Sequence, residues 1–227
     1  MNTEPVIANG VCHVALSYVG TNPEEGLAQF RILLELNGLR RDQDVLEIGC
    51  GALMASIPIM NFLDDEKFVG IEPNEWLVRD GLAPAGNRAI ADAKHPTFLY
   101  NQSFDARELG REFDFVIAHS VMSHAGYSQL EEFLVNTHRC LKPNGTVLFS
   151  LGLTEANAYG RPEHDEMPKD SVWLYPGGGF FHRSTIMAAA GKLFKSVEVV
   201  PEYTKMIMST HSSANHDWIK CSGKLIP

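Results

Sequence analysis

The stretch "DVLEIGCGALMAS", from Asp44 to Ser56, places an apolar run, an acid and two glycines ahead of an apolar helical pattern. A short apolar run favours a buried strand, and the spacing after it favours a helix. Glycine has no Cβ, so a ligand can approach the backbone closely at the turn between the two elements. The stretch therefore predicts a strand–turn–helix unit that binds a ligand.

Two kinds of cofactor use such a turn, the nicotinamide dinucleotides and S-adenosylmethionine. The nicotinamide fingerprint is G-x-G-x-x-G/A, in which the third small residue lets the helix pack tightly on the strand. Gly49 and Gly51 match its first two positions, but Met54 occupies the third. Glu47, two residues before the first glycine, is not part of that fingerprint. A nicotinamide-dependent oxidoreductase is therefore the weaker alternative.

The order of motifs along the chain resembles that of the class I S-adenosylmethionine-dependent methyltransferases. "EIGCG" matches their first motif, although Leu53 stands where a third glycine is common. Glu72 in "GIEPN" ends the second predicted strand, 25 positions after Glu47 (72 − 47). Asp105 in "SFDAREL" follows the third strand, and "FDFVIAHSVMSH" and "LKPNGTVLFS" continue in the family's order. Five such motifs in sequence make the resemblance specific, and it covers most of the chain.

The resemblance implies S-adenosylmethionine as cofactor and S-adenosylhomocysteine as product. Glu72 would accept the ribose hydroxyls, Asp105 the adenine amino group, and Glu47 would lie near the methionine end. We expect Leu53 to crowd the edge of this pocket while the two glycines keep it open. The expected cofactor contacts are Glu47, Gly49, Cys50, Gly51, Glu72, Pro73, Asn74, Phe104, Asp105, Ala106, Ala118 and His119.

Methyl transfer from a sulfonium needs proximity and alignment above all, and a base helps when the acceptor is an oxygen or nitrogen atom. The family places the segment after the fourth strand near the reactive methyl group, which makes His119 and His124 candidate bases. His182, at the end of the loop after the fifth strand, is a third candidate. His124 has an alternative role, because it can pack beneath the cofactor instead.

Aromatic residues near the N-terminus and in the long polar segment after the fifth strand are the candidate substrate contacts: Tyr18, Trp173, Tyr175 and Phe180. A small-molecule acceptor is expected, because the chain has no added substrate domain. The acidic run "RPEHDE" is typical of a solvated loop, and no metal is expected.

Strands alternating with helices predict an α/β fold, a three-layer αβα Rossmann-like sandwich with a mostly parallel sheet. The resemblance implies seven strands in the order 3-2-1-4-5-7-6, the last one antiparallel. We expect a first helix from Asn22 to Gly38 with Leu27, Phe30 and Leu34 on its buried face. Another helix is expected over 184–193, followed by "SVEVVPEYT" and "DWIKCSG" as the final strands.

We expect a single domain over residues 1–227, with a helical segment at 1–40 over the active site and a loop insertion at 152–182 that shapes the substrate pocket. The net charge of −9 argues against nucleic acid as a partner. No signal peptide and no membrane-spanning run are apparent, and the four cysteines are scattered, which favours a cytoplasmic protein. A monomer or homodimer is expected, with no membrane partner.

The leading hypothesis is a methyltransferase that uses S-adenosylmethionine to methylate an oxygen or nitrogen atom of a small molecule. The sequence leaves three alternatives open: the oxidoreductase, a non-catalytic subunit that binds S-adenosylmethionine, and methyl transfer to a peptide or protein.

Overall fold

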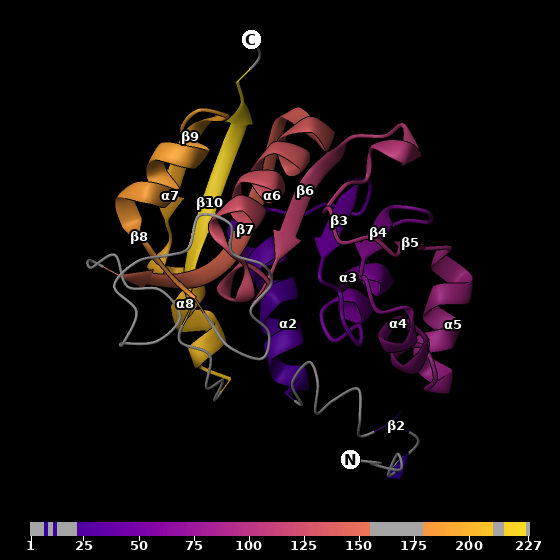
Figure 1. Ribbon diagram of the computed structural model, residues 1–227. Helices are drawn as coiled ribbons and strands as arrows, with labels where there is room; N and C mark the ends of the chain where they lie inside the picture. The colour runs from indigo at the N-terminus through magenta and orange to yellow at the C-terminus, as the bar shows by residue number, and fades with distance from the viewer. Residues whose placement is uncertain (1–6, 9–10, 13–21, 155–178, 211–215, 226–227) are drawn as a thin grey trace.

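The computed structural model describes residues 7–8, 11–12, 22–154, 179–210 and 216–225 (Figure 1). A twisted central sheet runs through this part of the chain with helices on both of its faces. The α/β class and the three-layer arrangement predicted from the sequence are confirmed.

Seven strands form the continuous path of the sheet in the order β5-β4-β3-β6-β7-β10-β9. This is the predicted order 3-2-1-4-5-7-6, and β10 is antiparallel to both of its neighbours, as expected for the last strand. The strands are β3 (Val45–Ile48), β4 (Phe68–Ile71), β5 (Thr97–Leu99), β6 (Phe113–Ala118), β7 (Leu141–Thr154), β9 (Phe194–Val199) and β10 (Asp217–Lys224).

Among the residues that the structure describes, three short strands lie outside this path. β8 (Phe180–His182) pairs in parallel with the last residues of β7, and β1 (Ile7–Ala8) pairs with β2 (Val11–Cys12). The predicted order is therefore kept, with β8 added beside the carboxyl end of β7.

Helices cover the two faces with separate sets of apolar side chains. On one face lie α2, η1, α3 and α8, and on the other α6 and α7. The helical elements are α2 (Pro23–Arg31), η1 (Ile32–Leu36), α3 (Ser56–Phe62), α4 (Glu75–Gly81), α5 (Ala85–Lys94), η2 (Arg107–Leu109), η3 (Met122–His124), α6 (Tyr127–Cys140), α7 (Arg183–Ala190) and α8 (Pro201–Met208).

The first helix begins as predicted but buries a different face. Asn22 caps α2, its side-chain oxygen accepting from the Glu24 N–H at 3.1 Å. Leu27, however, is 49% exposed, while Ala28 is buried. The reason is Gly26, where a Cβ would lie 2.4 Å from the Met54 carbonyl oxygen. The helix packs its glycine side directly on the backbone after the glycine turn, which rotates Leu27 outward.

The predicted strand "SVEVVPEYT" is correct only in its first half, because β9 ends at Val199 and α8 begins at Pro201. Proline lacks an N–H and has a fixed φ, so it suits the first position of a helix better than a strand. Tyr203 of α8 is buried, and its hydroxyl donates to Asn37 Oδ1 at 2.9 Å.

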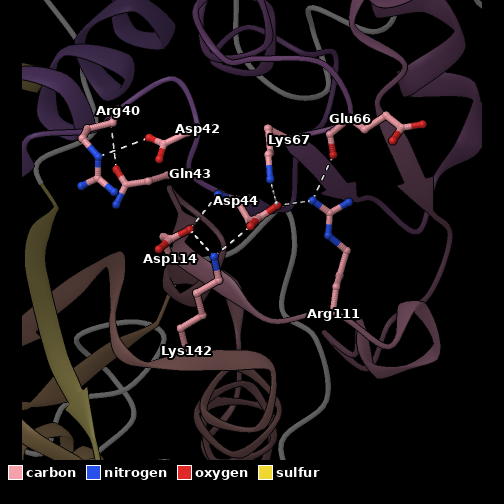
Figure 2. Close-up of polar contacts among 9 residues, drawn as sticks. All are labelled: Arg40, Asp42, Gln43, Asp44, Glu66, Lys67, Arg111, Asp114 and Lys142. Atoms are coloured by element: carbon pink, nitrogen blue, oxygen red, sulfur yellow. Dashed lines mark hydrogen bonds and ion pairs between the residues drawn. The ribbon is translucent and has the colours of Figure 1, made fainter.

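The amino ends of the parallel strands are joined by an ion-pair network around Asp44 (Figure 2). Its carboxylate, 13% exposed, accepts from Lys67 at 3.3 Å, from Lys142 at 2.8 Å and from Arg111. Asp114 accepts from Lys142 at 2.6 Å and from the Asp44 N–H at 2.8 Å. Burial alone would raise the pKa of Asp44, but Lys142 and Arg111 outweigh it and hold the pKa below its usual value. Ion pairs therefore connect the strands at this end of the sheet, opposite the glycine turn.

Replacing Asp44 by Asn should lower the free energy of unfolding by about 2–3 kcal/mol, because it leaves partly buried cations without their carboxylate. The matched control is Asp42→Asn, since Asp42 is 68% exposed and pairs only with Arg40 in Figure 2; it should cost under about 0.5 kcal/mol. Urea unfolding at pH 7 measures both. The contribution of Asp44 to the free energy of unfolding should decrease as the pH falls through the lowered pKa of Asp44. Equal effects of the two variants would refute a stabilising role of this ion-pair network.

Candidate functional site

The glycine turn joins β3 to α3 at the carboxyl edge of the sheet. Gly49 and Gly51 adopt φ values of +69° and +49°, a conformation that favours glycine. A Cβ on Gly49 would lie 2.4 Å from Val121 Cγ2, so the residue must also be small. The backbone conformation therefore favours glycine at both positions.

Leu53 does not occupy the place expected of it. It is fully buried, with φ +66°, and packs with Cys50, Val78 and Leu82 beneath the turn. The prediction that it crowds the edge of the pocket is wrong, because a positive φ turns its side chain into the core between the turn and α4.

Glu72, directly after β4, is 6% exposed and holds the glycine turn. One carboxylate oxygen accepts from the Gly51 N–H at 3.1 Å. The other accepts from the Asn74 N–H at 3.0 Å and from its side-chain amide at 2.9 Å. An ionised carboxylate has about four acceptor positions, and three of them are used here. Glu72 can accept one further donor as it stands, and a second by displacing the Asn74 side-chain amide.

Glu47, on β3, is the second buried acid of the site, at 5% exposure. It accepts from the Ser56 hydroxyl at 2.6 Å, a partner that the sequence did not single out. Burial raises the pKa of Glu47 to about 8, the Ser56 hydrogen bond opposes this, and the charge of Glu72 adds to it. Burial thus favours the protonated form of Glu47, and an approaching cation would favour its ionisation.

The turn after β5 carries the predicted adenine contacts. Asn101 organises it, its side-chain oxygen accepting from the Ser103 N–H at 3.2 Å and its amide donating to the Asp105 carbonyl at 2.9 Å. Phe104 and Ala106 are buried, and Phe104 has φ +58°.

The Asp105 side chain faces a cation rather than open solvent. Arg107 donates to both of its oxygens, at 2.9 and 2.5 Å, which lowers the pKa of Asp105. Asp105 also lines an open groove of about 400 Å³ beside α6. The backbone connects the two acids, because the Glu72 N–H donates to the Leu99 carbonyl at the end of β5, ahead of the turn that carries Asp105.

The three candidate bases have different surroundings. His119, after β6, has a 7% exposed side chain, and burial lowers its pKa to about 3. His182 caps α7, with Nδ1 accepting from the Ser184 N–H at 3.3 Å. His124 ends η3 and is half-buried. The structure also places His216, just before β10, near this group, with its ring centroid 6.1 Å from that of His119. Burial lowers the pKa of His216 to about 4, and the charge of His124 acts in the same direction.

The structure describes only some of the remaining predicted site residues. Pro73 is exposed beside Glu72, Cys50 and Ala118 are buried, and Phe180 on β8 is 47% exposed. Tyr18, Trp173, Tyr175 and the "RPEHDE" run lie outside the described residues. Within the described ranges there is no cluster of three or more His, Cys, Asp or Glu residues that could hold a metal ion. No helix in the part of the chain that the structure describes is long and apolar enough to cross a membrane.

Comparison with known proteins finds a matching domain model and similar folds. Residues 46–147 match a family model described as a methyltransferase domain. The fold is similar to the PH0226 protein from Pyrococcus horikoshii OT3, with 16% identity, TM-score 0.59 and coverage of 94% of this chain and 97% of that one. It is also similar to the glycopeptide N-methyltransferase MtfA complexed with S-adenosyl-L-homocysteine, with 15% identity, TM-score 0.58 and coverage of 97% and 100%. The [4+2]-cyclase SpnF has 12% identity, TM-score 0.58 and coverage of 88% and 80%.

Proposed function

We propose that the chain is a class I, Rossmann-like methyltransferase, which transfers a methyl group from S-adenosylmethionine to an oxygen or nitrogen atom of a small-molecule acceptor. The observation that carries the proposal is the Glu72 carboxylate, buried at the end of β4 and hydrogen-bonded to the glycine turn. A ribose offers two neighbouring hydroxyl donors, and Glu72 can accept them as a pair if the Asn74 amide moves aside. Gly49 and Gly51 leave the backbone open beside it.

Glu47 supports the assignment of the methionine end. The methionine portion of the cofactor carries an ammonium group and a sulfonium, both positive. A buried acid that is protonated when alone can ionise next to such a charge and stabilise it. MtfA, with which this fold is shared, was solved with S-adenosyl-L-homocysteine, and the same pocket chemistry is proposed for this chain.

In the proposed reaction, S-adenosylmethionine supplies a methyl group on a positively charged sulfur. A lone pair of the acceptor forms the new bond to the methyl carbon, and the electrons of the breaking carbon–sulfur bond pass to sulfur, leaving S-adenosylhomocysteine. An acceptor that carries a proton must release it, and His124 is the base that we assign. His119 is a poor base because its pKa lies near 3, and Nδ1 of His182 is engaged in capping α7.

The acceptor is proposed to bind over the carboxyl ends of β6 and β7, where Phe180, the first residue of β8, presents an exposed ring. The segments 1–40 and 152–182 are proposed to complete the pocket within a single domain. SpnF has a similar fold under a different activity name, so the fold alone does not decide the reaction. A non-catalytic subunit that binds the cofactor would pass every binding test below, and only turnover of labelled S-adenosylmethionine with an acceptor panel separates it.

Replacing Glu72 by Ala should weaken S-adenosylhomocysteine binding about 100-fold, because two charge-assisted hydrogen bonds are lost. Isothermal titration calorimetry measures the dissociation constant. The matched control is Glu202→Ala, the same change at an exposed position of α8, and it should bind as the parent does. Parent-like binding by the Glu72 variant, or tight NADH binding by the parent, would count against the proposal.

Binding of S-adenosylmethionine at pH 7 should release up to one proton, because the cofactor ammonium shifts Glu47 from its acid form to its carboxylate. Calorimetry in two buffers of different ionisation enthalpy gives the number of protons released. The Glu47→Gln variant cannot ionise and should lose this buffer dependence. If proton release is the same in parent and variant, Glu47 is not at the methionine end.

A further inference from the structure

A group of buried rings lies between α2 and the carboxyl edge of the sheet, and the proposed reaction does not use it. His119 stacks on Trp218 with ring centroids 5.3 Å apart and an interplanar angle of 11°, and the His216 ring lies 6.1 Å from His119. His119 Nε2, His216 Nδ1 and Trp218 Nε1 are buried without a hydrogen-bond partner among the residues described. Buried polar atoms without partners are rare and cost about 1–3 kcal/mol each, so their presence calls for a reason.

The position of the proton on His119 follows from its partner on α2. Gln29, 6% exposed, places its side-chain nitrogen 3.1 Å from His119 Nδ1. In this orientation of the amide its nitrogen can only donate, which makes Nδ1 the accepting nitrogen of the ring. In the neutral imidazole the proton then lies on Nε2, which makes His119 a hydrogen-bond donor and leaves it no free basic nitrogen.

The charges around His119 agree with a neutral ring. Glu25 of α2 approaches Nε2 at 3.5 Å and would favour the charged form. Burial has the larger effect and the neighbouring His216 acts in the same direction, so the pKa of His119 falls to about 3. Burial and His216 thus favour the neutral ring against the attraction of Glu25.

The place of His119 in the sheet connects it to the site. β6 pairs with β3, and Ile117 lies opposite Glu47. His119, two residues further on, is therefore level with Gly49 at the first glycine of the turn. A positive imidazolium at this level would repel a cationic sulfonium or ammonium group, whereas a neutral donor would not.

We propose that Gln29 is a positioning residue, which holds His119 as a neutral hydrogen-bond donor beside the methyl-transfer site and so leaves His124 as the base. This inference rests on the proposed function for the identity of the site. The arrangement of Gln29 and His119 itself does not depend on it.

The test is nitrogen-15 NMR of the histidine rings in the full chain. The parent should show His119 as the Nε2–H tautomer with no titration between pH 5 and 8. Gln29→Glu replaces the amide by a carboxylate, which can only accept, so His119 should carry a proton on Nδ1 and its pKa should rise by more than one unit. An Nδ1–H tautomer in the parent, or an unchanged tautomer in Gln29→Glu, overturns the inference.

Two controls keep the result interpretable. Gln102→Glu adds the same charge at an exposed position and should leave the His119 signals unchanged. If Gln29→Glu fails to fold, Gln29→Leu serves instead and should give a mixture of tautomers; a parent-like single tautomer there contradicts the proposal.

Titration of the parent with S-adenosylhomocysteine separates the two claims. A shift of the His119 Nε2 signal on binding supports its place beside the site, and binding without any shift overturns that part of the inference. Absence of binding at millimolar concentration refutes the proposed function and leaves the tautomer result standing.

Discussion

The site depends on one hydrogen bond, from the Gly51 N–H to the buried carboxylate of Glu72. It joins two elements that are distant in sequence, the glycine turn after β3 and the end of β4, and it requires the positive φ of Gly51. The Glu72 carboxylate is nearly buried, and the backbone and Asn74 supply the hydrogen-bond donors that such a group needs. A carboxylate held in this way is already oriented for hydroxyl donors before any ligand arrives.

Glu47, the neighbouring acid, is also affected by burial at this edge of the sheet. Glu47 is buried on the adjacent strand with one hydroxyl partner and the Glu72 charge nearby, so its pKa rises to about 8. Two acids at one edge of the sheet therefore differ in their supply of donors: Glu72 has three hydrogen-bond donors, and Glu47 has one. This difference suits a ligand with hydroxyl donors at one end and positive charge at the other. The ion-pair network around Asp44 holds the opposite ends of the same strands, so the two acids are placed by a firmly connected sheet (Figure 2).

The features that follow from local chemistry were predictable from sequence. A glycine at a left-handed turn, an acid ending a strand and an asparagine cap before Pro23 each have a local cause, and Gly49, Glu72 and Asn22 lie as expected. The features that depend on distant contacts were not. The buried face of α2 is decided by the approach of Gly26 to Met54, and α8 begins at a proline that the strand pattern before it conceals.

The histidines at the site also depend on contacts between residues distant in sequence. Residue type and position made His119 a candidate base, but its chemistry is set by Gln29, 90 residues away in sequence, and by the ring of Trp218. His216 drew no attention because no motif surrounds it. Its importance arises only when β10 inserts between β7 and β9 and brings it close to His119.

The most direct test of the account is a crystal structure of the protein with S-adenosylhomocysteine. The account predicts that the ribose hydroxyls lie within hydrogen-bond distance of the Glu72 carboxylate, with the Asn74 side chain displaced and the amino group of the ligand toward Glu47. A ligand bound elsewhere, or a ribose that leaves the hydrogen bonds between Glu72 and Asn74 intact and makes none of its own to Glu72, would contradict it.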